Sequence, residues 1–167
     1  MTDLFAQPDG ATPLDPDERE GLIPTSIATR GELNEAEEIN IAKAAAWAYR
    51  QTRGDLLTDD FVKRLHKRMF GEVWRWAGKY RLTEKTLGID PHEIPTAIRA
   101  AIDDVRYWTD HKTYKVDELC VRLHHRSVSI HPFPNGNGRH TRMLADLLRA
   151  RLVGEPFSWG RVDLVNA

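Results

Sequence analysis

The sequence predicts an all-α protein, and three of its features support that prediction. Apolar residues recur at helical spacing in several long segments. No series of alternating apolar and polar residues predicts a sheet. Thr29 and Glu32 form a capping box, in which a hydroxyl and a carboxylate each satisfy a free N–H group at a helix start. We therefore expect helices to dominate the fold.

The first long helix is predicted from Thr29 to about Arg53. Its apolar positions are Leu33, Ala36, Ile39 or Asn40, Ala44 and Trp47. Three further residues on it are acidic and are interpreted as a solvated face, namely Glu35, Glu37 and Glu38. Residues 1–28 contain several prolines and predict an extended arm, so that residues 29–167 form the helical domain.

Four further helical segments are predicted after the first helix. They open at Thr58 or Asp59, at Pro95, at Val116 and near Gly138. Residues 73–95 hold two Trp and two Gly without a helical period, and they predict irregular structure with a short β-hairpin flap from Thr83 to Ile89. The expected architecture is a helical bundle with this flap.

Composition excludes several classes of function. The 167 residues suffice for one domain, and 41% hydrophobic with 29% charged residues is typical of a soluble globular protein. With a net charge of -1, no global field attracts nucleic acid or a membrane. The single cysteine, Cys120, excludes an intrachain disulfide, and no secretory signal or membrane-length apolar run is present. We expect a cytoplasmic protein.

The stretch HPFPNGNGRHTR, residues 131–142, combines a base with an anion site. Pro132 and Pro134 end the preceding helix, and the glycines permit a ligand to approach the backbone. The next helix starts behind them, so its free N–H groups point at the loop. Two arginines three residues apart can hold a polyphosphate, and a histidine with a pKa of about 6.5 suits a general base. The predicted chemistry is transfer of a nucleotidyl or phosphoryl group to a hydroxyl.

Other interpretations of these residue types remain open. The loop alone could be an Asn-Gly turn, although a turn does not explain His131 at one end and two arginines at the other. His124 and His125 could bind zinc with two other histidines, but a structural role is favoured because no Cys or acid completes the set. Trp74 and Trp76 are interpreted as core residues rather than as platforms for a base.

The stretch resembles the signature of the Fic (Fic/Doc) domain family, His-Pro-Phe-x-Asp/Glu-Gly-Asn-Gly-Arg-x-x-Arg, and departs from it only at Asn135. Residues 123–130 resemble the helix that precedes this motif, and residues 73–81 resemble the segment before the family's flap. Two N-terminal runs, residues 12–18 and 29–35, are similar to the bacterial subgroup called mobile mystery protein B.

The resemblance implies a protein adenylyltransferase that moves AMP from ATP to a Tyr, Thr or Ser hydroxyl. His131 would be the base, Phe133 a buried anchor, and Gly136, Asn137 and Gly138 the anion hole. Arg139 and Arg142 would hold the distal phosphates. The flap, within residues 83–94, would clamp a target segment by strand-like pairing.

The departure at Asn135 concerns magnesium, because the family's carboxylate at this position binds the metal. An amide offers only an oxygen dipole, so we expect weaker Mg²⁺ binding, through water or the nucleotide phosphates. The family's inhibitory Ser/Thr-x-x-x-Glu-Gly/Asn pattern has no strict match, and Glu35 or Glu32 is the candidate restraint on Arg142.

Two alternatives to AMP transfer follow from the same resemblance. The Doc branch is a phosphotransferase, whose motif has Ala and Lys where this chain has Gly136 and Arg139. The second alternative is a nucleotide-binding or toxin-like partner protein without catalytic activity. The subgroup also implies a helix-turn-helix partner protein and a closing helix beyond Ala167, which suggests a truncated C-terminus. Neither a membrane nor direct nucleic-acid binding is expected.

Overall fold

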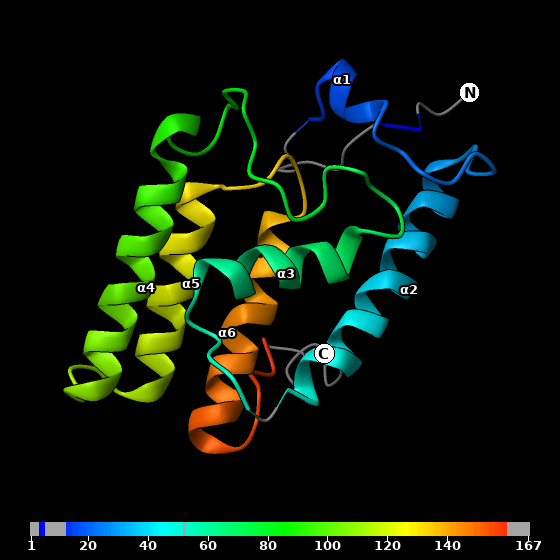
Figure 1. Cartoon of the computed structure of the whole chain (residues 1–167). Helices are drawn as coiled ribbons and strands as arrows, with labels where there is room; N and C mark the ends of the chain where they lie inside the picture. The colour runs from blue at the N-terminus through cyan, green and yellow to red at the C-terminus, as the bar shows by residue number, and fades with distance from the viewer. Residues whose placement is uncertain (1–3, 6–12, 52, 160–167) are drawn as a thin grey trace, which may run out of the picture.

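The computed structural model describes residues 4–5, 13–51 and 53–159, and the all-α prediction is confirmed for them. The helices are α1 (Pro16–Arg19), α2 (Arg30–Tyr49), α3 (Asp59–Phe70), the 3₁₀ turn η1 (Pro91–Glu93), α4 (Ile94–Asp110), α5 (Val116–Ile130) and α6 (Asn137–Val153) (Figure 1). Strand-like pairing in the described residues is limited to one isolated bridge between Leu22 and Trp74.

Side-chain caps set the helix starts where the sequence predicts them. The Thr29 hydroxyl accepts the Glu32 N–H at 3.3 Å, and the Glu32 carboxylate accepts the N–H groups of Ala28 and Thr29 at 2.8 and 2.9 Å. The Thr58 hydroxyl caps α3 by accepting the Phe61 N–H at 3.0 Å. The first long helix ends at Tyr49, slightly before the predicted end at Arg53.

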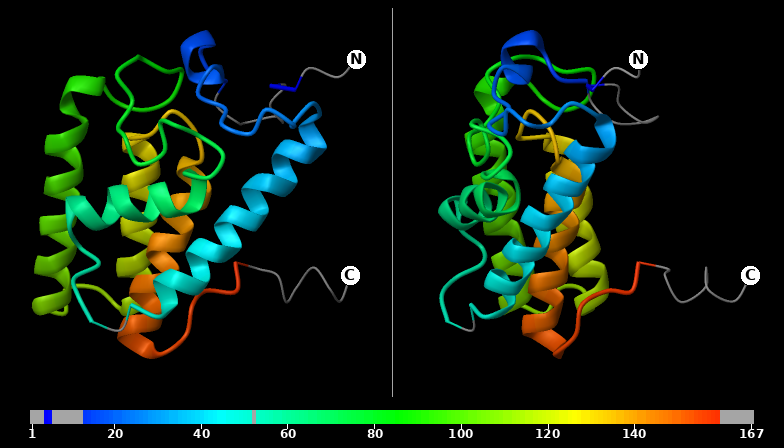
Figure 2. Two further views of the ribbon diagram at one scale, coloured as in Figure 1. Left: turned by 45° about the vertical axis from the view of Figure 1, so that its right-hand side comes forward. Right: turned by 90° about the vertical axis from the view of Figure 1, so that its right-hand side faces the viewer.

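Helices α4, α5 and α6 run side by side, while α3 crosses the bundle and α2 lies against α3 and α6 (Figures 1 and 2). Helix α5 packs between α4 and α6. The centre of the core consists of side chains with no exposed surface, namely Leu65, Met69, Ile94, Val105, Cys120, Phe133 and Ala145. The loop between α5 and α6 therefore sits at one end of a rigid bundle.

The buried face of α2 includes polar residues, and this corrects one prediction. Glu37 is only 4% exposed, so it does not belong to the solvated face on which Glu35 and Glu38 lie. It falls on the stripe of Leu33, Asn40 and Ala44, which has helical spacing. Ile39 is 51% exposed, so Asn40 occupies the inward position.

The predicted hairpin from Thr83 to Ile89 does not form, and this is a second correction. The segment, here called the flap loop (residues 83–89), has no strand pairing. The buried Arg81 side chain organises it instead, because its guanidinium donates to the carbonyls of Thr83 and Ile89. A side chain thus replaces the backbone ladder that a hairpin would need.

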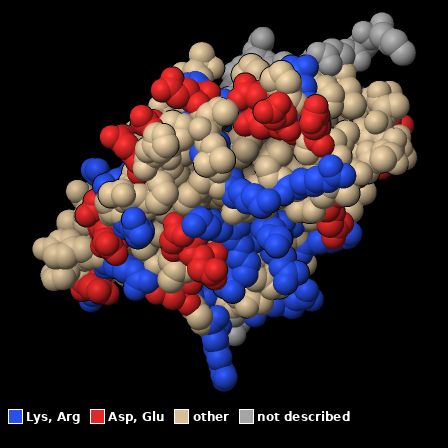
Figure 3. All heavy atoms as spheres, turned by 45° about the horizontal axis from the view of Figure 1, so that its top comes forward, with Lys and Arg blue, Asp and Glu red and all other residues tan. Residues whose placement is uncertain are grey.

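The described part of the N-terminal arm contains one helical turn, α1, which lies beside the flap loop (Figure 2). The backbone near α1 pairs with residues before the flap, through the Ile23 N–H to Val73 and the Arg75 N–H to Gly21. In the described part of the chain, no helix is long and apolar enough to cross a bilayer. Figure 3 shows Lys and Arg gathered beside Asp and Glu on one face, so the small net charge conceals local patches of both signs.

Candidate active site

The proposed base, His131, directly follows α5 in a left-handed backbone conformation, with φ 54° and ψ 60°. A non-glycine residue in this region is strained, by an amount of about 1–3 kcal/mol. The strain turns the chain sharply out of α5 and into the motif loop (residues 131–138). The surrounding contacts must hold this conformation, and Arg81 supplies one of them through the His131 carbonyl.

Arg81 joins the flap loop to the backbone of the base. Its Nε donates to the His131 carbonyl at 2.6 Å, and a second guanidinium nitrogen, Nη1, donates to the Thr83 carbonyl at 2.8 Å. Its own N–H donates to the Pro132 carbonyl at 2.9 Å. Gly88 of the flap loop, at a φ of +103°, packs closely on His131. A Cβ at this position would lie only 2.6 Å from the Cβ of His131. The flap loop therefore lies directly on the base.

The environment of His131 keeps its imidazole neutral. The residue is only 7% exposed, and burial lowers its pKa below the usual value. The cation of Arg81 and, less strongly, that of Lys85 also lower the pKa, while a hydrogen bond with the Val128 backbone raises it. A neutral imidazole at pH 7 can accept a proton, as a general base must.

The start of α6 supplies free N–H groups to the motif loop. The N–H of His140 is the first to bond back into this helix, to the Gly136 carbonyl at 2.9 Å. The N–H groups of residues 137–139 precede it and have no carbonyl within the helix to bond. Gly138 faces open space, since no atom lies within 4 Å of the position of its absent Cβ. An anion can therefore approach these groups.

The side chain of Asn137 fixes the loop rather than facing a ligand. Its oxygen accepts the Phe133 N–H at 2.9 Å, and its nitrogen donates to the Phe133 carbonyl at 2.8 Å. Asn137 can therefore contribute only its backbone to an anion hole. Position 136 requires glycine for a structural reason. Its φ is 77°, and a Cβ there would lie 2.5 Å from the Phe70 ring.

Two buried, neutral histidines, His66 and His140, pack against the motif loop on its core side. The His66 ring stacks on fully buried Phe133 at 3.7 Å and contacts His140 edge-on. The Gly78 N–H donates to Nδ1 of His66, so the ring hydrogen is on Nε2, which donates to the Asn135 carbonyl at 3.0 Å. His140 similarly bonds the Val62 carbonyl through Nε2 at 2.9 Å, while its buried Nδ1 has no hydrogen-bond partner among the described residues.

The two motif arginines have different surroundings. Arg139 donates to Glu37 of α2 at 2.6 Å and lies over the Phe70 ring. The second oxygen of Glu37 accepts the Trp74 indole N–H at 2.8 Å, so this carboxylate is held from two sides. Arg142 is exposed and lies near the Trp159 ring, 5.8 Å from its centroid. Both arginines project from the first turns of α6.

The predicted restraints and metal ligands are placed as follows. Glu32 caps its own helix and Glu35 is exposed, whereas the α2 carboxylate that contacts the motif is Glu37, on Arg139. Asn135 is half-buried in the motif loop. Nowhere in residues 4–5, 13–51 and 53–159 do three His, Cys, Asp or Glu side chains meet as a metal site. His124 instead contacts the Thr141 hydroxyl at 2.9 Å.

Three residues of this site have roles that the sequence did not predict. Arg81 and His66 gave no signal, because nothing local distinguishes a buried Arg or His that bonds distant carbonyls. Glu37 did have a signal, since it follows Leu33 by four residues on the buried stripe of α2. Trp74 is buried as predicted, and Trp76 stacks on it with ring centroids 5.0 Å apart.

The chain is similar in sequence to known proteins. A family model described as the Fic/DOC family matches residues 56–148. The chain is 30% identical over 101 residues to the protein adenylyltransferase fic-1 of Caenorhabditis elegans, a match that covers 58% of this chain and 20% of that protein. It is 29% identical over 111 residues to the protein adenylyltransferase VbhT of Bartonella schoenbuchensis, covering 62% and 23%. The chain thus spans about a fifth of the length of these relatives.

Solved structures share the fold. The BepC protein of Bartonella tribocorum, with bound AMPPNP, superposes with a TM-score of 0.66 at 16% identity, covering 89% of this chain and 84% of that one. Fic-1 from Caenorhabditis elegans gives a TM-score of 0.60 at 23% identity, covering 82% and 42%. At these identities the likeness concerns the fold alone.

The buried histidines predict a loss of stability in acid. The unfolded chain binds protons at histidines near pH 6.5, whereas burial lowers the pKa of folded His140 to about 4. The free energy of unfolding should therefore fall as the pH drops from about 6.5 toward 4. The variant His140→Gln keeps an N–H for the Val62 carbonyl but cannot titrate. Over this pH range its free energy of unfolding should therefore fall less than that of the parent, by on the order of 3 kcal/mol.

Urea unfolding at a series of pH values measures this difference. His66 and His131 also have lowered pKa values, so a part of the acid loss should persist in the variant. His125→Gln, at an exposed position of α5, is the matched control and should retain the parent's curve. Equal slopes for the parent and His140→Gln would contradict the assignment.

Proposed function

The chain belongs to the Fic/DOC family, and on that premise we propose that it transfers AMP from ATP to a hydroxyl of a target protein. The observation that carries the proposal is the neutral His131 in the loop that leads into the free N–H groups of α6, with the Arg139 and Arg142 side chains on the first turns of the same helix. The relatives named as protein adenylyltransferases support it.

The reaction follows from the roles of these groups. Nε2 or Nδ1 of His131 accepts the proton of a Tyr, Thr or Ser hydroxyl, and the oxygen attacks the α-phosphorus of ATP. A new bond joins that oxygen to the α-phosphorus while the bond to the β-phosphate bridge breaks, so pyrophosphate leaves with the electron pair. The N–H groups of residues 137–139 and the two arginines stabilise the phosphate charge.

Magnesium enters this proposal as part of the nucleotide substrate. No three His, Cys, Asp or Glu side chains of the described residues gather as a metal site, and Asn135 brings an amide rather than a carboxylate to the motif. Mg²⁺ is then held mainly by the ATP phosphate oxygens, with Asn135 as a weak ligand, directly or through water.

A Doc-like phosphotransferase is the second candidate, and a non-catalytic nucleotide-binding protein is the third. The geometry at Gly136 favours AMP transfer over the second, because the alanine of the Doc motif would collide with the Phe70 ring here.

Further parts of the proposal rest on resemblance in sequence. The similarity of residues 12–18 and 29–35 to the mobile mystery protein B subgroup supports membership of that subgroup. Membership would imply a bacterial, cytoplasmic setting and a helix-turn-helix partner protein. Residues 29–167 are then the Fic-like domain, and residues 1–28 are an arm on it. The flap loop takes the target segment.

Helix α2 regulates the site in this proposal. Sequence resemblance pointed to Glu32 or Glu35 acting on Arg142, and the contact that the structure offers runs from Glu37 to Arg139. Glu37 is 5% exposed at its side chain, so its charge is poorly screened by water. ATP phosphates must share or displace this carboxylate to bind Arg139.

Labelled ATP distinguishes the three candidate functions. The label of [α-³²P]ATP should become bound to protein, and His131→Ala should lower the rate at least about 100-fold, the usual contribution of a general base. Covalent attachment of the γ-label instead would indicate a phosphotransferase. If neither label becomes attached to protein, the chain is a nucleotide-binding module without catalysis. His125→Ala, an exposed histidine of the same helix, should transfer label at the parent's rate.

The metal role of Asn135 predicts a gain of function. Asn135→Asp should lower the Mg²⁺ concentration for half-maximal label transfer, since a carboxylate adds charge to a hard cation. The measurement is a Mg²⁺ titration at fixed ATP. An unchanged titration would mean that position 135 does not contact the metal.

Release of Arg139 predicts tighter ATP binding. Glu37→Gln keeps an oxygen for the Trp74 N–H but removes the charge, so ATP affinity should rise about fivefold, equivalent to roughly 1 kcal/mol for a partly exposed ion pair. Isothermal titration calorimetry measures it, with exposed Glu35→Gln as the control. Equal affinities for the parent and both variants would exclude this restraint.

A further inference from the structure

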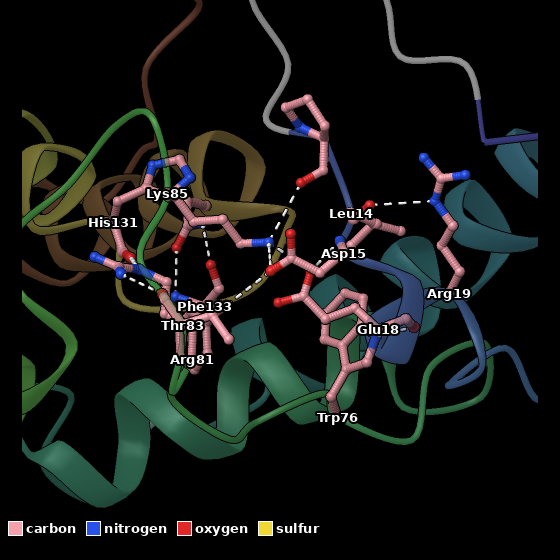
Figure 4. A network of polar contacts seen from close by, with 12 residues as sticks. Leu14, Asp15, Glu18, Arg19, Trp76, Arg81, Thr83, Lys85, His131 and Phe133 are labelled. Carbon is pink, nitrogen blue, oxygen red and sulfur yellow. Dashed lines mark hydrogen bonds and ion pairs between the residues drawn. The ribbon is translucent and has the colours of Figure 1, made fainter.

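An acidic part of the N-terminal arm is docked on the flap loop. Lys85 of that loop places its ammonium 2.9 Å from Asp15 and 2.6 Å from Glu18, and 3.3 Å from the Pro13 carbonyl (Figure 4). The Thr83 hydroxyl donates to the same Asp15 oxygen at 2.8 Å. Two side chains of the flap loop thus hold one acidic segment (residues 15–18).

The acidic segment covers a lysine that would otherwise face solvent. The Lys85 side chain is only 3% exposed, whereas that of Asp15 is 44% exposed. Lysine is almost never this buried unless it is paired. The Lys85 and Thr83 hydrogen bonds lower the pKa of Asp15, so this carboxylate stays charged at neutral pH.

The segment is held mainly by contacts outside its own helix. A four-residue helix such as α1 is too short to be stable alone. Leu14 is buried, and the Glu18 carbonyl accepts the Trp76 indole N–H at 3.0 Å. The contacts with Trp76, Thr83 and Lys85 therefore hold the segment in its helical turn on the flap loop.

The same flap loop lies on the base of the proposed reaction. Gly88 contacts His131, and Arg81 bonds the carbonyls of both Thr83 and His131 (Figure 4). A peptide held by Thr83 and Lys85 consequently passes beside His131. The side chains that hold the arm are placed where a target segment would lie.

We propose that Thr83 and Lys85 recognise an acidic segment of the target protein, with carboxylates three residues apart, and that residues 15–18 occupy this site in the free chain. The proposal rests on the proposed function for the identity of the bound protein as substrate. The binding itself requires no catalysis. A covalently attached segment has an effective concentration on the order of millimolar, which would mask the site from added peptide.

A peptide-binding experiment tests the proposal in the full chain carrying His131→Ala. The probe is a fluorescein-labelled peptide with the sequence of residues 13–20, PLDPDERE, followed by fluorescence anisotropy. Asp15→Asn with Glu18→Gln should weaken the internal occupant, so the variant should bind the probe at least about tenfold more tightly than the parent. Adding Lys85→Met should abolish that gain.

The chain offers a matched control. Asp17 and Glu20 are exposed acids of the same arm, and Asp17→Asn with Glu20→Gln makes the same change of charge. This control should bind the probe no better than the parent. Equal binding by the two double variants, or a gain that survives Lys85→Met, would overturn the proposal.

Folding and function are controlled separately. Asp15→Asn alone retains the Glu18 carboxylate that accepts the Asp15 N–H, so it preserves α1 and should give a smaller gain; circular dichroism melting verifies both variants. Label transfer with His131 intact reports on the proposed function. Transfer without peptide binding would refute only the recognition site, and binding without transfer would refute only the AMP transfer.

Discussion

The site depends on one buried cation, Arg81, and on the backbone carbonyls around it. A buried charge is costly unless it is hydrogen-bonded, and this one donates to the carbonyls of Thr83, Ile89, Ile130 and His131. The carbonyls of Ile130 and His131 lie at the C-terminal end of α5. The last carbonyl groups of a helix have no partners within it, and the helix dipole stabilises a cation placed there. Arg81 therefore satisfies the end of a helix, fixes the flap loop and stabilises the strained backbone of His131 at once.

The same cation also shapes the chemistry. It lies near His131 and lowers the pKa of the imidazole, in addition to the effect of burial. The residues that support the loop from below, His66 and His140, are neutral for the related reason that they are fully buried. The site thus concentrates its positive charge on arginines and keeps its histidines uncharged, which suits an anionic substrate and a histidine that must accept a proton.

How much the sequence could predict depends on the range of the interactions. Helix starts were predictable because Thr29 and Thr58 act on residues three positions away. The position of the motif loop between two helices was predictable because its prolines, its glycines and the start of α6 are contiguous. The flap loop was predicted as a hairpin because its irregularity comes from Arg81, which bonds a carbonyl fifty residues further along the chain.

Glu37 shows the same limit in a helix. The helical period placed it on the buried stripe of α2, but burial of a carboxylate is acceptable only with partners, and those are Trp74 and Arg139. Arg139 is 102 residues away, so no local pattern identifies it. The burial of Glu37 could therefore be predicted from the sequence, whereas its partners, Trp74 and Arg139, could not.

Both ends of the proposed reaction are held by acids from the N-terminal part of the chain. Glu37 contacts Arg139 at the phosphate end, and residues 15–18 contact Lys85 at the target end. All of these acids precede residue 56, where the match to the family model begins. The matched region contains the proposed base, the N–H groups and the cations, and the residues before it supply the charges that oppose those cations. Substrate binding at either end must therefore compete with an internal carboxylate, which makes the N-terminal part of the chain a determinant of how readily this site accepts its substrates.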